Sequence, residues 1–169
     1  MSTLRLTRNL YDAIRAHGEE TYPHECCGAL LGLLTPEGWV VSESIRAGNA
    51  RTDSAHNRYL ISTAEIVKIE REARSWGLSI AGFYHSHPDH PAHWSLTDFE
   101  EAHWLGSSYV ITAVAKGKAT ETNSFLLAGS SEEDKRFEKE FVQVEDHAPG
   151  EESASDWTGS TTVSEEKAR

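Results

Sequence analysis

The chain has 169 residues, 38% of them apolar and 25% charged, which is the size of one domain with some residues to spare. Its formal net charge of −11 argues against a broad basic surface of the kind that binds nucleic acid. No apolar run approaches the roughly 20 residues that span a bilayer, and residues 1–12 lack the apolar core of a secretory signal. The two cysteines, Cys26 and Cys27, are adjacent and cannot join distant segments, which favours a reducing, cytoplasmic setting.

The negative charge is concentrated towards the C-terminus. Residues 132–169 carry a net charge of −7, and from residue 146 onward the sequence is rich in Ser, Thr, Gly and Glu. Trp157 and Val163 are the only large apolar residues in that last segment. Such a composition buries too little surface to offset the conformational entropy lost on folding. We therefore predict a folded domain over residues 1–145 and an acidic, disordered tail over residues 146–169.

The first half of the domain shows two helix patterns on either side of a hairpin. Apolar spacing predicts a helix over 7–18, and a continuous apolar run predicts a buried strand over 29–34. A Thr-Pro-Glu-Gly turn then leads into a second strand over 39–47 and a polar loop over 48–58. The pattern Ser62-Thr-Ala-Glu65 is that of a capping box and opens a helix that ends at Gly77.

The second half alternates strands with one more helix. We predict strands over 78–84, 109–115 and 120–128, and a helix over 95–105. The stretch 137–144 fits either a helix face or an edge strand. Helices interleaved with hairpin-type strands predict an α/β or α+β sandwich built on one central mixed sheet.

The segment around His85 and His87 carries the pattern of a metal site. Two histidines that are two residues apart at the end of a strand point to the same side of the sheet. Asp98 follows in the next helix and can return a carboxylate as a third ligand. Three protein ligands with an open fourth position are typical of a catalytic rather than a structural zinc site. Such a site needs a general base, and Glu25, just before a buried strand, is the candidate.

These residues together resemble the JAMM (MPN-plus) metalloprotease signature, which is a distant Glu, then His-x-His-Pro, six residues, and Ser-x-x-Asp. Glu25, His85-Ser-His87-Pro88, Ser95 and Asp98 match it with the spacing intact. The flanks, Tyr-Pro-x-Glu-Cys-Cys-Gly among them, resemble the small stand-alone bacterial members over residues 4–145. Trp94 departs from the pattern, because relatives often have Pro there.

The resemblance implies a cytidine-deaminase-like α-β-α sandwich and a role for each matching residue. His85, His87 and Asp98 would bind one Zn²⁺ per chain. Glu25 would be the general base, and Ser95 would hydrogen-bond the oxyanion. The implied substrates are peptide or isopeptide bonds after the C-terminal Gly-Gly of ubiquitin-like or sulfur-carrier proteins.

Plainer interpretations exist for several of these residues. Ser95 and Asp98 also form a helix-capping pattern, which is compatible with a catalytic role. We expect His24, His90 and His93 to line the cleft or face solvent, and the two cysteines to be small buried residues. Tyr84 is a candidate lining residue of the cleft. Four polar residues of the 48–58 loop are candidates for gripping a substrate tail: Arg51, Asp53, Asn57 and Arg58.

Two other functions compete with the metallopeptidase. A non-catalytic MPN scaffold that binds a ubiquitin-like partner is disfavoured because no ligand of the signature is missing. A nucleobase deaminase is excluded because the chain lacks the Pro-Cys-x-x-Cys ligand pair of those enzymes. No nucleic-acid or membrane partner is expected.

Overall fold

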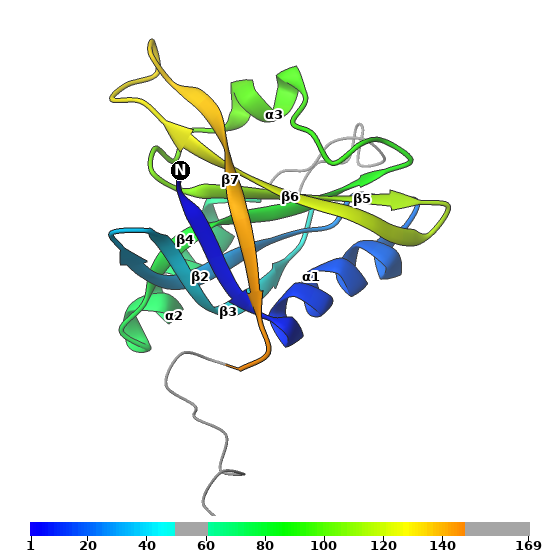
Figure 1. Ribbon diagram of the computed structural model, residues 1–169, viewed down its shortest axis with the longest axis horizontal. Coiled ribbons are helices and arrows are strands. Elements are labelled where there is room, and N and C mark those ends of the chain that lie inside the picture. Colours follow the sequence, from blue (N-terminus) through cyan, green and yellow to red (C-terminus); the bar gives the residue numbers. More distant parts are fainter. Residues whose placement is uncertain (50–60, 148–169) are drawn as a thin grey trace, which may run out of the picture.

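The computed structural model describes residues 1–49 and 61–147, which form a mixed sheet with helices around it (Figure 1). No helix in these two ranges is long and apolar enough to cross a membrane. Most of the predicted 48–58 loop and nearly all of the predicted tail lie outside the described residues. In chain order the elements are β1 (Thr3–Thr7), α1 (Arg8–Thr21), β2 (Cys27–Thr35), β3 (Gly38–Ala47), α2 (Thr63–Ser75), β4 (Ser79–Pro88), α3 (Leu96–Glu101), β5 (Ser108–Ala115), β6 (Lys118–Ala128) and β7 (Arg136–Glu145).

The described strands form one sheet in the order β1-β3-β2-β4-β5-β6-β7. The pairs β2–β3, β2–β4, β5–β6 and β6–β7 are antiparallel, whereas β4 and β5 run parallel. Strand β1 pairs in parallel with both β3 and β7, so the sheet curls until its two ends meet. Strand β4, which carries the two histidines, is hydrogen-bonded to β2 on one side and to β5 on the other.

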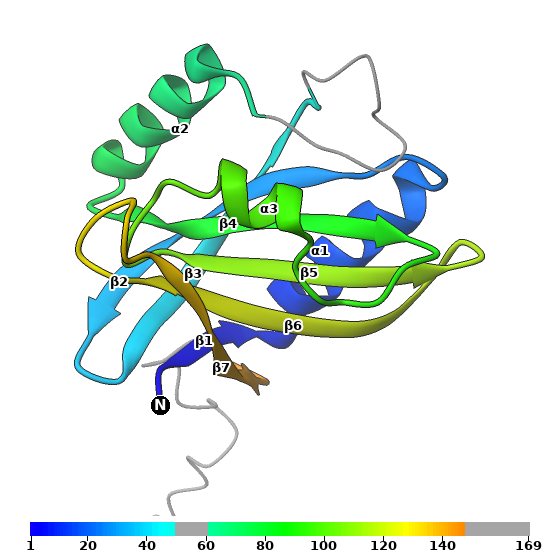
Figure 2. The same cartoon turned by 90° about the horizontal axis from the view of Figure 1, so that it is seen from above.

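Helices cover both faces of this sheet because its strands alternate between two apolar clusters. Leu31 of β2 packs with Ala73 of α2 in one cluster, and Leu30 packs with Ile14 of α1 in the other. Figure 2 shows α3 in front of β4 and β5, with α1 behind them. The predicted α-β-α sandwich with a central mixed sheet is confirmed.

The ends of the two longer helices follow from local hydrogen bonds. Thr7 caps α1 by accepting the Leu10 N–H at 3.3 Å. Ser62 caps α2 by accepting the Glu65 N–H at 3.2 Å, as the sequence predicts. The Glu65 carboxylate, however, accepts the Gly48 N–H at 3.0 Å. That bond links the end of β3 to the start of α2.

Two strands differ from the prediction. Strand β1 was not expected, because a five-residue segment with only Leu4 and Leu6 buried gives too short a pattern. The ambiguous stretch 137–144 is strand β7 rather than a helix. It pairs with β6 on one side and with β1 on the other, so it is not an edge strand either.

The predicted helix over 95–105 was too long. Helix α3 ends at Glu101, and Ala102 adopts an extended backbone with φ −83° and ψ 115°. Ala102 is buried, and the Trp104 ring contacts Phe83 edge-on with centroids 5.4 Å apart. Strand β4, in turn, extends to Pro88 instead of ending near Tyr84. Both histidines therefore lie within a strand.

Candidate metal centre

Strand β4 places the side chains of His85 and His87 on one face of the sheet. They are two residues apart, and their Nε2 atoms lie 3.0 Å from each other. Only 1% of the His85 side chain and 9% of the His87 side chain is exposed. Burial on this scale requires polar partners for both rings.

Asp98 reaches the two imidazoles from the first turn of α3. Its Oδ1 lies 3.3 Å from His85 Nε2, and its Oδ2 lies 3.2 Å from His87 Nε2. The start of the helix is a capping box, in which the Asp98 N–H donates to Ser95 Oγ at 3.1 Å and the Ser95 N–H donates to Asp98 Oδ2 at 2.7 Å. The predicted capping role of Ser95 is therefore confirmed, and it holds the Asp98 carboxylate over the histidines.

The three side chains form a group that fits a metal ion. With one ligand atom taken from each residue, the donor atoms all lie within 4.8 Å of one another, and the two Nε2 atoms are 3.0 Å apart. Donors of a tetrahedral Zn²⁺ with bonds of about 2.0 Å are about 3.3 Å apart, so the group is compact enough to close on one ion. His87 Nδ1 lies 2.8 Å from the Pro91 carbonyl, so a proton on Nδ1 leaves Nε2 free as a ligand. These three side chains would supply three ligands to a metal ion.

The pKa shifts of Asp98 and His85 suit metal binding. Burial raises the pKa of Asp98, but the neighbouring His85, the hydrogen bond with His87 and the Ser95 amide outweigh it and hold that pKa well below its usual range. Burial lowers the pKa of His85. A carboxylate and a neutral imidazole are the forms that bind Zn²⁺.

Glu25 is brought to the same face of the sheet. Cys27 is paired with His85 across β2 and β4, and Glu25 lies two residues before Cys27. Glu25 is buried, with 6% of the residue's surface exposed. Burial lowers the pKa of His87, but Asp98 and, more weakly, the negative charge of Glu25 raise it overall. The charge of Glu25 is therefore felt at the His87 ring.

The remaining histidines and Tyr84 lie elsewhere. His24, His90 and His93 are exposed and do not belong to the metal-binding group found among the described residues. The expectation that Tyr84 lines the cleft was wrong. Tyr84 alternates with His85, faces α1, and hydrogen-bonds His17 Nδ1 at 2.8 Å. Loop residues Arg51, Asp53, Asn57 and Arg58 lie outside the described residues.

The two cysteines are buried, free and on opposite faces of the sheet. Cys26 packs in the cluster that contains Ile14 of α1, and Cys27 packs in the cluster that contains α2. The interpretation of both as small buried residues is confirmed.

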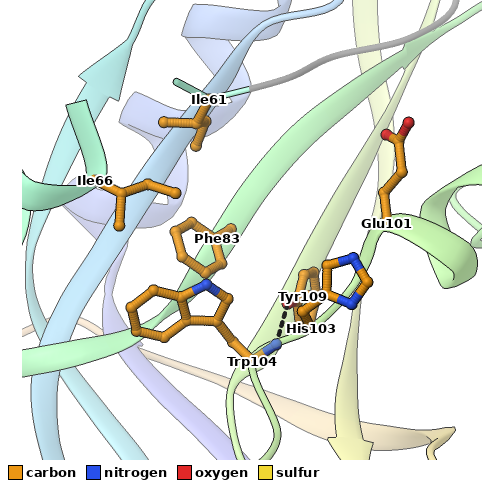
Figure 3. Close-up of a pocket in the computed structure, with 7 residues that line it drawn as sticks. All are labelled: Ile61, Ile66, Phe83, Glu101, His103, Trp104 and Tyr109. Carbon is orange, nitrogen blue, oxygen red and sulfur yellow. Dashed lines mark hydrogen bonds between the residues drawn. The ribbon is translucent and has the colours of Figure 1, made fainter. Parts of the chain in front are cut away.

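An apolar cavity of about 170 Å³ (Figure 3) lies against Phe83, whose side chain is on the same face of β4 as that of His85. Phe83 contributes to its wall and lies two residues before His85 on β4, a separation of about 7 Å. Sequence reasoning missed this cavity and the Pro91 carbonyl, because neither has a signal in the local pattern. The lining residues are Ile61, Ile66, Phe83, Glu101, His103, Trp104 and Tyr109.

The chain is similar in sequence to known proteins. Residues 7–128 match the family described as prokaryotic homologs of the JAB domain. A protein of Haloferax volcanii named desampylase is 32% identical over 114 residues, which are 65% of this chain and 80% of that protein.

Two solution structures are similar in fold. A protein from Desulfitobacterium hafniense has a TM-score of 0.72 at 24% identity and covers 88% of this chain and 96% of its own. A protein from Salinibacter ruber has a TM-score of 0.63 at 36% identity and covers 88% of this chain and 95% of its own. The chain therefore belongs to the prokaryotic JAB family, within the JAMM group that its motif resembles.

Proposed function

We propose that the protein is a zinc-dependent metallopeptidase or isopeptidase. It hydrolyses the bond after the C-terminal Gly-Gly of a ubiquitin-like or sulfur-carrier protein. The observation that carries this proposal is the group of His85, His87 and Asp98, in which both histidines are buried and one ligand atom of each residue lies within 4.8 Å of the others. Two imidazoles and a carboxylate are the ligand types that zinc prefers in catalytic sites. The similarity to the desampylase supports, more broadly, a hydrolase that acts on conjugates of ubiquitin-like modifiers.

His85, His87 and Asp98 would hold the zinc ion. When bound, Zn²⁺ supplies Lewis-acid chemistry, in that it polarises the scissile carbonyl and lowers the pKa of a water molecule towards about 7. The Glu25 carboxylate would accept the proton of the attacking water and later return it to the leaving amine. Its burial supports this role, because little bulk water surrounds the carboxylate and competes with the reacting groups for its proton.

Ser95 would stabilise the negative charge that develops on the carbonyl oxygen. Its Oγ already accepts the Asp98 N–H, so its hydroxyl proton remains available to donate. The residue is exposed and next to the donor group, as a contact with substrate requires. A fixed donor in this position is worth a few kcal/mol in the transition state.

The apolar cavity supports a substrate whose C-terminal tail carries an apolar residue just before Gly-Gly. An extended Gly-Gly pair spans about 7 Å. That is the spacing along β4 between His85 and Phe83, which lines the cavity. With the scissile bond at the donor group, an apolar residue just before Gly-Gly would reach Phe83 and Trp104. The alternative of a non-catalytic scaffold is less well supported, because such a protein has no need of a complete donor set.

The test uses Glu25→Gln on a ubiquitin-like protein extended by a short peptide after Gly-Gly. The variant should keep about one zinc per chain, and cleavage should fall by roughly 10²–10⁴, the usual contribution of a general base. Glu19→Gln, at an exposed position of α1, is the matched control and should cleave like the parent. Full activity of Glu25→Gln would remove Glu25 as the base. A zinc-loaded parent that cleaves neither this precursor nor an isopeptide-linked conjugate would overturn the proposed function.

A further inference from the structure

Ser86 lies between the two histidine donors but points to the opposite face of the sheet. It is fully buried, with 0% of its surface exposed. Its Oγ accepts the backbone N–H of Cys26 at 2.9 Å, and its own N–H donates to the Cys26 carbonyl at 3.2 Å. Ser86 thus holds both backbone groups of the residue that follows Glu25.

These two bonds extend the pairing of β2 with β4 to the edge of the catalytic site. The last regular pair of the two strands is Cys27 with His85. The bonds between Ser86 and Cys26 add one more residue pair beyond it, and Glu25 directly precedes Cys26 in the sequence. On the other side of Glu25, a turn is closed by the His24 N–H, which donates to the Thr21 carbonyl at 2.8 Å. The Glu25 backbone is therefore held between the turn and Ser86.

Helix α1 fixes Ser86 from behind. Gly18 approaches so closely that a Cβ built on it would lie 3.1 Å from Ser86 Cβ and 3.0 Å from Val114 Cγ2. One residue earlier, His17 hydrogen-bonds Tyr84, the α1-facing neighbour of Ser86 on β4. Ser86 has no room to withdraw towards the helix, so its hydroxyl is fixed in its contact with Cys26.

We propose that Ser86 is a positioning residue for Glu25. Its hydroxyl sets the Cys26 backbone against β4 and thereby places the Glu25 carboxylate relative to His85 and His87. Ser86 itself touches neither substrate nor metal, because its side chain faces α1. This inference rests on the proposed function only in the role that it gives to Glu25.

The first test is Ser86→Ala, with Ser108→Ala as its matched control. Ser108 is fully buried on neighbouring β5, and its hydroxyl has no hydrogen-bond partner among the described residues. In Ser86→Ala we expect kcat to fall about ten- to a hundredfold, as for a displaced catalytic group, with KM within about twofold. The zinc content and zinc affinity should not change. Ser108→Ala should match the parent. A kcat of Ser86→Ala within twofold of the parent, or a parallel loss of zinc affinity, overturns the proposal.

The second test measures the hydrogen bond between Cys26 N–H and Ser86 Oγ and does not depend on catalysis. Residue-resolved amide hydrogen exchange should show the Cys26 N–H protected in the parent and in Ser108→Ala. It should exchange at least about tenfold faster in Ser86→Ala, because its acceptor is gone. Unchanged protection at Leu30 in β2 reports that the variant is folded. Equal Cys26 exchange in parent and Ser86→Ala overturns the proposal, even if the parent proves inactive and the proposed function fails for its own reasons.

Discussion

The two faces of β4 differ in what they contribute to the molecule. The donor face, formed by Phe83, His85 and His87, borders the apolar cavity and the Asp98 carboxylate. The α1 face, formed by Tyr84 and Ser86, is covered by helix α1, whose Gly18 packs closely against Ser86. Because side chains alternate along a strand, one stretch of sequence can present reactive groups on one side and be held in place from the other.

The two faces also differ in charge. On the donor face the half-buried Asp98 carboxylate lies against two imidazoles, and a carboxylate withdrawn from water needs partners that stabilise its charge. On the α1 face the buried contact is between His17 and the Tyr84 hydroxyl, and burial lowers the pKa of His17. A change on the donor face should therefore affect metal binding first. A change on the α1 face should affect stability and the placement of the strand.

The largest effect on the donor face is expected from Asp98→Ala. The zinc affinity should fall by more than about 100-fold, because substitution of residues that only hydrogen-bond to metal ligands already lowers metal affinity by about 10–100-fold. Cleavage should fall with it. Glu100→Ala, an exposed carboxylate on the same short helix, is the matched control and should bind zinc like the parent. Isothermal titration with zinc measures both affinities, and an unchanged affinity in Asp98→Ala would exclude Asp98 as a ligand.

On the α1 face the corresponding change is Gly18→Val. The new side chain would meet Ser86 and Val114, and overpacking of this kind lowers the free energy of unfolding by about 1–3 kcal/mol. Ala16→Val, at an exposed position of the same helix, should lower it by less than about 1 kcal/mol through helix propensity alone. Denaturant unfolding measures both values. Equal losses in the two variants would contradict the close contact of α1 with β4.

The smallest effect concerns the two cysteines, one on each face. Burial raises the pKa of Cys26 to about 11 and that of Cys27 to about 12, so both thiols are protonated at neutral pH. Alkylation by iodoacetamide at pH 7.5 should be at least about 100-fold slower in the folded protein than in the unfolded one. Raising the pH towards 11 should speed the reaction as the thiolate forms. Mass spectrometry counts the adducts, and rapid modification of either cysteine at pH 7.5 would contradict its burial.

Much of this architecture was predictable because it follows local periodicity. The apolar run in β2, the cap at Ser62 and the His-x-His spacing each depend on neighbouring residues only. The capping pattern at Ser95 predicted the geometry that carries Asp98. The prediction that Glu25, the two histidines and Asp98 form one site came from the resemblance to a family, because no single local pattern connects these segments.

The features that sequence reasoning missed depend on contacts between distant segments. Strand β1 is stabilised by β7, more than 130 residues away along the chain. The hydroxyl of Ser86 acts on Cys26, 60 residues earlier. The expectation for Tyr84 failed because Tyr84 is adjacent to His85 on β4, and adjacent residues of a strand face opposite sides.

The most direct measurement is an anomalous diffraction map, recorded at the zinc absorption edge, from crystals of the zinc-loaded protein. The account predicts one zinc per chain, with bonds of about 2.0–2.2 Å to His85 Nε2, His87 Nε2 and an Asp98 carboxylate oxygen. It also predicts the fourth position open to water or substrate, with Glu25 on that side. Zinc held by other donors, such as the exposed His24, His90 and His93, or no zinc between His85, His87 and Asp98, would contradict the account.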